Sequence, residues 1–307
     1  MTAPTIPVID LSDRREAVVA ELAAAAGSWG FFQVTGHGLA PALVADVQAA
    51  ARAFFASDLA LKQAASRTLD NPFGYYDREL TKNLRDRKEI FDFAPLGQTP
   101  WPPAMPELRP VLQAFADACH ALALDLLQRL CEGLAQPPAS LVAHFAPAHG
   151  SFLRLNHYPT GDLPLGAEAP PAGPFGISHH TDAGALTVLL QDQVPGLQVQ
   201  YRGAWLDVDP LPDALTINVG DMLQVWSNDR YLAPVHRVRA SSDQARLSMA
   251  WFLNPGQDSI IAPLPGLVSA SSPAHYRPLP WQEFRNLRAL GDYGDYGEEV
   301  QISDYRR

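Results

Sequence analysis

Three side chains in the second half of the chain have the residue types and the spacing of a metal site. One residue separates His180 from Asp182, and residues i and i+2 of a β-strand, or of its immediate end, point to the same face. His236 comes far enough along the chain to lie on a different strand. Two imidazoles and one carboxylate on one face of an octahedral ion leave three positions open, which favours non-haem Fe(II). The pattern therefore predicts an open iron site.

A cation and a hydroxyl follow the second of these histidines. One residue separates Arg246 from Ser248, so we expect both side chains on one strand face. A planar guanidinium fork beside a hydroxyl suits one end of a dicarboxylate. Together with the predicted iron site, this pair indicates a binding site for 2-oxoglutarate.

The His-x-Asp pair is a weak signal by itself, because most such pairs are surface or capping residues. The apolar strand around His236 and the Arg-x-Ser motif after it strengthen the metal prediction. His179 competes with His180 as the first ligand. Adjacent residues of a strand face opposite ways, so only His180 shares a face with Asp182. We therefore expect His179 to be a polar residue that does not bind the metal directly.

Composition restricts the class of protein. The chain has 307 residues, enough for a substantial core, with 47% apolar and 18% charged residues, as in ordinary soluble enzymes. A formal net charge of −10 argues against nucleic-acid or anionic-membrane partners, which need a basic surface. We find no signal peptide and expect no transmembrane helix. Cys119 and Cys131 form no disulfide framework, so we expect a cytoplasmic protein. A monomer or weak dimer suits this balance.

The elements that must position these residues change character along the chain. The first half has helical periodicity, and its longest run looks like a helix that backs a sheet. Helices are expected at 14–27, 41–57, 107–134 and the start of 281–307, and early strands at 6–11, 29–34 and 86–93. From Phe152 onward the period changes to two, with short strands separated by turns. We expect these strands at 152–158, 185–191, 197–201, 204–208, 215–219, 222–226, near Tyr231, at 235–240 and at 247–254.

This pattern predicts a mainly β fold with flanking helices, in the form of a double-sheet jelly roll. We expect residues 1–307 to form a single catalytic unit. Its parts would be a helical N-terminal region over 1–148, a jelly-roll core over 149–258 and a C-terminal extension over 259–307.

Short motifs in a fixed order carry a resemblance over nearly the whole chain. The N-terminal ones are Ile6-Pro7-Val8-Ile9-Asp10-Leu11 and Trp29-Gly30-Phe31-Phe32-Gln33-Val34-Thr35-Gly36-His37-Gly38. The later ones are His180-Thr181-Asp182, Gly196-Leu197-Gln198-Val199, Asn218-Val219-Gly220-Asp221, Trp226-Ser227-Asn228, His236-Arg237-Val238, Arg246-Leu247-Ser248, Asp295-Tyr296-Gly297 and Ile302-Ser303. The chain resembles the Fe(II)/2-oxoglutarate-dependent dioxygenase superfamily, in its isopenicillin N synthase-like branch.

The resemblance implies a distorted double-stranded β-helix (jelly roll) backed by N-terminal and C-terminal helices, with 1–148 as the dioxygenase N-terminal type of region. It also implies Fe(II) bound by His180, Asp182 and His236. O₂ would be the oxidant, and ascorbate is a possible reductant. The implied reaction is the oxidation of a small organic molecule, most often its hydroxylation, with release of succinate and CO₂. No catalytic residue beyond the metal ligands is implied.

The same resemblance assigns residues to the co-substrate. Arg246 and Ser248 would hold a carboxylate of 2-oxoglutarate, and Tyr158 and Asn156 match a family segment whose side chains reach the same molecule. Asn156 and Tyr158 share a strand face, which agrees with that role, although a cross-strand pair in the core would look the same.

Four aromatic residues are candidates for contact with the prime substrate. Tyr75 and Tyr76 follow Gly74 where this branch has substrate-facing loops, and Phe93 and Phe252 complete the set. Their side chains favour a small, moderately apolar organic molecule. Lys88-Glu89 is either part of the substrate mouth or a solvated charged pair.

Other noticeable residues have a structural interpretation. His37 lies in a turn flanked by glycines, where a hydrogen-bonded structural role is expected. Asn218, Gly220 and Asp221 are expected to build a tight turn, with Gly220 permitting unusual dihedral angles. Trp226 and Trp251 are expected in the core.

Three other functions fit parts of the pattern. An oxidase of the same fold that omits 2-oxoglutarate, like isopenicillin N synthase or aminocyclopropane carboxylate oxidase, keeps the Arg-x-Ser motif; stoichiometric succinate formation separates it. A non-catalytic sensor that binds a small ligand conflicts with the intact ligand triad. A jelly-roll interaction protein with a structural metal conflicts with an open three-ligand site, because structural sites usually close all positions.

Overall fold

The computed structural model describes residues 4–307 apart from 69, 164, 166–171, 241 and 292–299. Two sheets form its centre. The large sheet contains, in spatial order, β1 (Val8–Asp10), β2 (Phe31–Thr35), β12 (Leu215–Val219), β9 (Leu186–Gln191), β14 (Arg246–Leu253), β7 (Phe152–Tyr158), β6 (Glu89–Phe93) and β3 (Gly74–Tyr76). The small sheet contains β11 (Ala204–Asp207), β10 (Leu197–Tyr201), β13 (His236–Arg239) and β8 (Phe175–His180).

The remaining elements surround these sheets. The helices are α1 (Arg15–Ser28), α2 (Pro41–Phe55), α3 (Leu59–Gln63), α4 (Leu108–Gly133), α5 (Asp221–Trp226) and α6 (Trp281–Leu290), with short 3-10 turns η1 (Pro138–Phe145), η2 (Pro265–Leu267) and η3 (Ile302–Tyr305). Two strand pairs lie outside the main sheets, β4 (Leu80–Thr81) with β5 (Leu84–Arg85) and β15 (Ile260–Ile261) with β16 (Leu279–Pro280).

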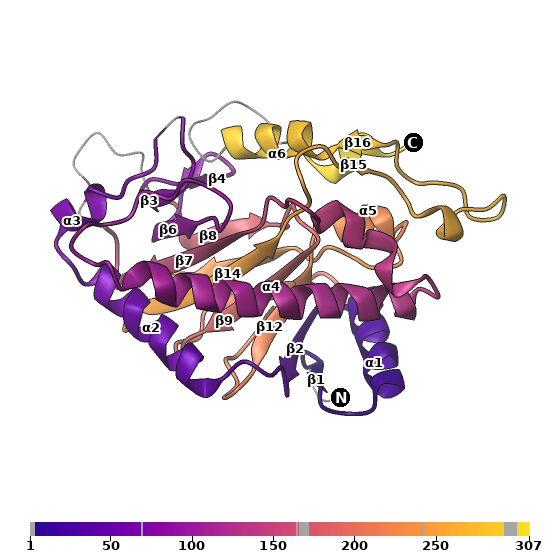
Figure 1. Ribbon diagram of the computed structural model, residues 1–307, viewed down its shortest axis with the longest axis horizontal. Coiled ribbons are helices and arrows are strands. Elements are labelled where there is room, and N and C mark those ends of the chain that lie inside the picture. Colours follow the sequence, from indigo (N-terminus) through magenta and orange to yellow (C-terminus); the bar gives the residue numbers. More distant parts are fainter. Residues whose placement is uncertain (1–3, 69, 164, 166–171, 241, 292–299) are drawn as a thin grey trace.

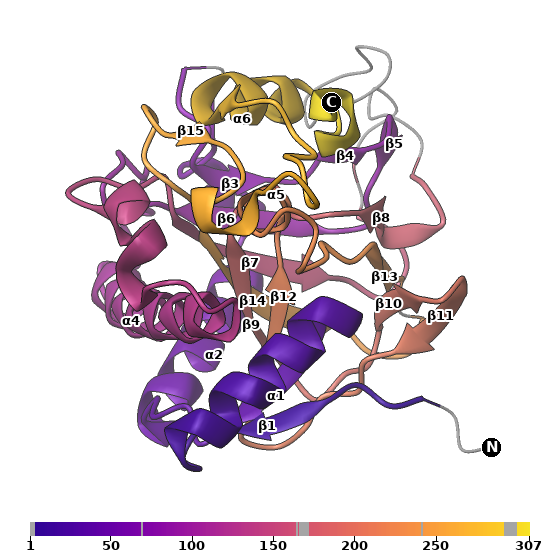
Figure 2. The same ribbon diagram turned by 90° about the vertical axis from the view of Figure 1, so that its right-hand side faces the viewer.

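Alternation along the strands gives the large sheet two different faces. On β7, Leu153 and Leu155 point to the layer of α1, α2 and α4, where the main apolar core lies. The other face meets the small sheet, because Phe31 and Tyr158 pack with Leu197 in a second apolar cluster. Figure 2 shows these layers, with α4 on one side of the large sheet and the small sheet on the other. The predicted jelly roll backed by helices is confirmed.

Helix α4 is the long helix that crosses the large sheet (Figure 1). It is long and apolar enough, by length and composition, to cross a membrane, and 44% of its most apolar stretch is buried inside the protein. Leu112, Phe115 and Leu126 are fully buried in the core between the helices and the sheet. Core helices of soluble proteins have the same composition, so this helix is weak evidence for a membrane.

The structure corrects two predicted elements and contains a strand, β8, that the sequence did not predict. The segment 222–226 is helix α5 and not a strand. Its apolar residues Met222, Leu223, Val225 and Trp226 follow helical spacing, but all are buried, so no polar face distinguished the helix from a buried strand. Tyr231 lies in a loop, where its hydroxyl donates to Leu130 O. Strand β8, which carries His180, had no apolar run to predict it, and it forms by pairing with β13.

Two further predictions concern Gly220 and the motif Asp295-Tyr296-Gly297. Gly220 has an ordinary φ of −102°, so unusual dihedral angles do not explain it. A Cβ at this position would lie 2.2 Å from Gly184 O, so the glycine permits a close approach of two backbone segments. Asp295-Tyr296-Gly297 lies outside the described residues.

Candidate metal and co-substrate site

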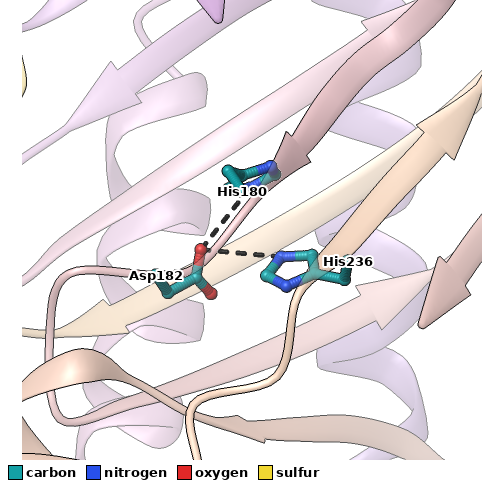
Figure 3. A group of neighbouring side chains, drawn as sticks. All are labelled: His180, Asp182 and His236. Carbon is teal, nitrogen blue, oxygen red and sulfur yellow. Dashed lines mark ion pairs between the residues drawn. The ribbon is translucent and has the colours of Figure 1, made fainter. Parts of the chain in front are cut away.

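The three predicted metal ligands come together at one end of the small sheet. His180 ends β8 and His236 begins β13, and the two residues are direct partners across these antiparallel strands. Asp182 follows just after β8. Its Oδ1 lies 3.6 Å from Nε2 of each histidine, and the three ligand atoms lie within 4.8 Å of one another (Figure 3). This group can hold one metal ion.

Both imidazoles are oriented by backbone carbonyls. His180 Nδ1 donates to Ser178 O over 2.8 Å, and His236 Nδ1 donates to Pro234 O over 3.1 Å. The proton on each Nδ1 leaves the lone pair of each Nε2 available for a metal ion beside Asp182. Burial, with His236 close by, lowers the pKa of His180 to about 3. His180 is therefore neutral at physiological pH, as a metal ligand must be.

The carboxylate of Asp182 is fixed by two neighbours from the large sheet. Thr187 Oγ1 and Asn218 Nδ2 both donate to Asp182 Oδ2, the latter over 2.8 Å. Although burial opposes ionisation, the adjacent histidines and these hydrogen bonds hold the pKa of Asp182 below its ordinary value. The second oxygen, Oδ1, is left facing the histidines. Asn218 therefore supports the metal site, a role that the sequence prediction missed because its partner is distant in the chain.

The predicted 2-oxoglutarate residues form a second group in the same cavity. Arg246 is opposite Tyr158, and Ser248 is opposite Asn156, on the paired strands β14 and β7. The guanidinium of Arg246 lies 5.1 Å from the Tyr158 ring centre, and its NH1 is 3.4 Å from Ser248 Oγ. Its NH2 donates to Gln191 Oε1 over 2.8 Å. These contacts aim one buried cation into the cavity.

The buried guanidinium of this group fits a bound carboxylate. Arg246 is 1% exposed and forms no ion pair with any carboxylate of the described residues. Within the same part of the chain, the buried donor Arg246 Nε has no hydrogen-bond partner. A buried cation without a counter-charge is unfavourable, and a ligand carboxylate would supply one. The donor set thus fits a dicarboxylate.

Strand β9 relates the two groups in space. Thr187 donates a hydrogen bond to the metal ligand Asp182, and Gln191 accepts one from Arg246. The two β9 positions are about 13 Å apart at about 3.3 Å per residue. A molecule that reached from the metal ligands toward Arg246 must therefore be elongated along the strands.

The opposite end of the cavity is aromatic and cationic. Phe152 and Phe252 are partners on β7 and β14, with ring centres 4.9 Å apart. The guanidinium groups of Arg154 and Arg285 lie 5.7 Å and 6.0 Å from the Phe152 ring centre. All four residues line the cavity that contains the metal ligands.

A buried charge network supports this end. Glu79 Oε2 accepts hydrogen bonds from Lys88 Nζ over 2.6 Å and from Arg154 NH1 over 3.0 Å. Arg154 also holds Asp92 with two hydrogen bonds of 2.8 Å. Although burial opposes ionisation, Arg154 and Lys88 hold the pKa of Glu79 well below its usual range. Lys88 therefore lines the cavity as a buried ion-paired residue and is not part of a solvated pair.

The predicted substrate residues are divided between the two faces of the sheet. Phe252 lines the cavity, and Tyr75, Tyr76 and Phe93 do not. Phe93 is paired with Leu153 and Tyr75 with Phe91, so both point into the helix-covered core, where Tyr75 donates to Glu89. Tyr76 lies on β3, the edge strand, and the guanidinium carbon of Arg67 lies 3.6 Å from the centre of its ring. The predicted substrate contact of Tyr75 and Phe93 is therefore corrected, and that of Tyr76 stays a prediction.

Other predicted residues lie where a structural role requires. His179 is exposed beside His180. His37 accepts a hydrogen bond at Nδ1 from the backbone N–H of Leu39. Trp226 and Trp251 are each 1% exposed in the core. Cavity residues that the sequence did not reveal as such include Thr187, Arg154, Arg285 and Arg288. Gln191, which accepts the hydrogen bond from Arg246, was also not predicted.

Known proteins match the chain over nearly its whole length. The family described as the 2OG-Fe(II) oxygenase superfamily matches residues 149–255, and the one described as non-haem dioxygenase in morphine synthesis N-terminal matches residues 6–114. Jasmonate-induced oxygenase 4 from Arabidopsis thaliana is 32% identical over 92% of this chain and 81% of that protein. Gibberellin 2-beta-dioxygenase 5 from Oryza sativa subsp. japonica is 33% identical over 98% of this chain and 87% of that protein. A crystal structure of JOX2 in complex with 2OG, Fe and JA has a TM-score of 0.85 and 30% identity, covering 97% of this chain and 88% of that one.

Proposed function

The chain belongs to the 2OG-Fe(II) oxygenase superfamily, and we propose that its reaction is the hydroxylation of a small, largely apolar carboxylic acid. The resemblance inferred from the motifs is confirmed. The protein is an Fe(II)- and 2-oxoglutarate-dependent dioxygenase that oxidises a small organic molecule and releases succinate and CO₂.

In this proposal His180, Asp182 and His236 supply the protein ligands of Fe(II). Bound Fe(II), with 2-oxoglutarate and O₂, supplies the oxidising power for attack on an unactivated C–H bond. Thr187 and Asn218 keep Asp182 ionised and turned toward the two imidazoles. The backbone carbonyls behind the histidines keep their lone pairs on the metal side. With only three protein ligands, a bound Fe(II) would keep coordination positions available for the co-substrate and O₂.

Arg246 grips the distal carboxylate of 2-oxoglutarate, with Ser248 and Tyr158 beside it and Asn156 as a further polar contact. The absence of a carboxylate partner for this buried guanidinium among the described residues supports the assignment. The guanidinium is held by Gln191, so it is oriented before the co-substrate arrives. None of these residues takes part in bond making. They position the co-substrate and exclude water.

The main support for a carboxylic acid substrate is the pair of guanidinium groups, of Arg154 and Arg285, near the Phe152 ring. They lie at the Phe152–Phe252 end of β7 and β14, and Arg246 lies at the other end of β14. A substrate carboxylate near Arg285 and Arg154 would therefore not compete with 2-oxoglutarate. Each guanidinium carries five N–H donors and can bind more than one acceptor at once. Phe152 and Phe252 would cover the apolar body, with the reacting C–H bond turned toward the metal.

Matched substrate pairs test this proposal. Small aromatic and alicyclic carboxylic acids would be compared with their methyl esters at saturating 2-oxoglutarate, measuring succinate above the substrate-free rate together with hydroxylated product. We expect the acids to stimulate succinate formation and the esters to fail. Esters that perform as well as the acids would refute a carboxylate-binding end.

A variant of the cation tests the same point from the protein side. For an acid substrate, Arg285→Gln should raise KM roughly 10- to 150-fold, because a charge-assisted hydrogen bond contributes about 1.5–3 kcal/mol. For a neutral substrate analogue, KM should not change. An equal effect on acid and neutral analogue would contradict the assignment of Arg285.

A further inference from the structure

We propose that Arg288 of α6 is a positioning residue for the metal site, which it reaches through the loop between β8 and β9. The inference rests on the proposed metal ligands and not on the proposed substrate. Helix α6 lies at the opposite edge of the molecule from α1 and α2 (Figure 1), far from the metal ligands in sequence.

The loop that carries Asp182 is fixed mainly by backbone hydrogen bonds from the start of α5. Asp221 N donates to Asp182 O over 2.7 Å, and Met222 N donates to Gly184 O over 3.0 Å. Neither bond reaches Thr181, the residue between the two metal ligands of this loop. The carbonyl of Thr181, in the peptide that leads into Asp182, therefore needs another partner to fix its direction.

Arg288 provides that partner. Its NH2 donates to Thr181 O over 2.9 Å, although the two residues are 107 positions apart. Arg288 is 8% exposed and lines the metal-containing cavity. A hydrogen bond from a buried cation to this carbonyl fixes the plane of the Thr181–Asp182 peptide, and with it the Cα position from which the Asp182 side chain projects toward His180. Rotation of that plane would turn His180 and Asp182 away from each other.

The guanidinium is itself held from its other side. Its NH1 donates to Val300 O over 3.3 Å and to Gln301 Oε1 over 3.1 Å. Gln301 caps η3, and Tyr305 of η3 packs edge-on against Phe284 of α6 with ring centres 5.9 Å apart. The planar fork of arginine serves both sides at once, which a lysine ammonium cannot reproduce.

The C-terminal residues are also anchored near the second histidine. Arg306 NH1 and NH2 contact Asp229 Oδ2 and Oδ1 over 2.9 Å and 3.0 Å. Asp229 lies in the segment between α5 and β13, and β13 begins with His236. The unit of α6 and residues 300–307 is therefore tied to both chain segments that supply metal ligands. Arg288 is its contact with the first of them.

A metal titration tests this role without any substrate. Metal-free wild-type protein and Arg288→Gln would be titrated with Co(II), following the visible absorption of the bound ion. We expect Arg288→Gln to raise the Co(II) Kd about tenfold, since residues that orient metal ligands typically contribute 10- to 100-fold. The band should also change in position, because the ligand geometry changes. Arg288→Lys should raise the Kd less, by about threefold, because it keeps the charge but loses the fork.

Arg277→Gln is the matched control. Arg277 also donates to a backbone carbonyl of the C-terminal segment, Asp304 O over 3.1 Å, but it is exposed and has no contact with the metal loop. The Arg277→Gln variant should bind Co(II) with the affinity of the wild-type protein. Wild-type affinity and an unchanged band in Arg288→Gln would overturn the proposal, and so would an equal loss in Arg277→Gln. If Arg288→Gln does not fold, the Co(II) titration of Arg288→Lys tests the proposal instead. Wild-type Co(II) affinity in that variant would count against Arg288 as a positioning residue.

Discussion

A methyl group added at Gly220 should disturb the metal site without touching any ligand side chain. The alanine Cβ of Gly220→Ala would lie 2.2 Å from Gly184 O and 3.1 Å from Asp182 O. Relief of this overlap requires the two backbone segments to separate by roughly 1 Å, since protein interiors are close-packed. The hydrogen bonds from Gly220 N to Ala185 O and from Met222 N to Gly184 O cross this contact. We expect the free energy of unfolding to fall by about 2–4 kcal/mol, from overpacking and weakened hydrogen bonds.

The loop that moves carries Asp182, so metal affinity should fall as well. Urea unfolding of the metal-free protein and a Co(II) titration measure the two effects separately. Gly203→Ala is the control, because Gly203 has a φ of +83° but nothing within 4 Å of its Cβ position. It should lower the free energy of unfolding by about 1 kcal/mol from backbone strain and leave the Co(II) Kd unchanged. Wild-type stability and wild-type metal affinity in Gly220→Ala would refute this explanation of the glycine.

Three further predictions concern the site. Arg246→Lys should raise the Kd for 2-oxoglutarate roughly 10- to 150-fold, because one charge-assisted hydrogen bond of the fork is lost; calorimetric titration measures it, with exposed Arg239→Lys as control, and an unchanged Kd would count against the assignment. His236→Ala should abolish metal-dependent turnover, and normal succinate production by this variant would remove His236 from the ligand set. The pKa of His180 is lowered from 6.5 to about 3 in the folded protein, so the unfolded chain binds more protons between those values. The metal-free protein should therefore lose stability as pH falls from about 6.5 to about 3, and His180→Gln should lose less; equal pH slopes in urea unfolding would contradict this.

Local patterns in the sequence predicted most of what carries the proposed metal and co-substrate site. Period-two alternation located β7, β10 and β12 with the bounds that the structure has. The i, i+2 rule placed His180 with Asp182 and Arg246 with Ser248, because each pair depends only on one strand or its end.

Contacts between distant segments could not be predicted in this way. Asn218 was interpreted as a turn residue, because nothing near it in sequence indicates that Asp182 is its partner. The faces of Tyr75 and Phe93 follow from the register of β3 and β6 against β7, which their own sequence does not determine. Arg285 and Arg288 reach the cavity from a helix in the C-terminal extension.

The sequence did not predict helix α5 for a different reason. Its apolar residues are buried on all sides, so the sequence has no polar face from which a period can be measured. The division into regions 1–148, 149–258 and 259–307, the cytoplasmic location and the monomeric or weakly dimeric state stay predictions.

The central claim is that one cavity binds Fe(II) and 2-oxoglutarate together through the residues named above. The most direct measurement is anaerobic: Fe(II) and then 2-oxoglutarate are added to metal-free protein, and the visible metal-to-ligand charge-transfer band is recorded. We predict a band in wild type that is lost in Arg246→Ala at the same co-substrate concentration. Iron binding without a band in wild type, or an undiminished band in Arg246→Ala, would contradict the account.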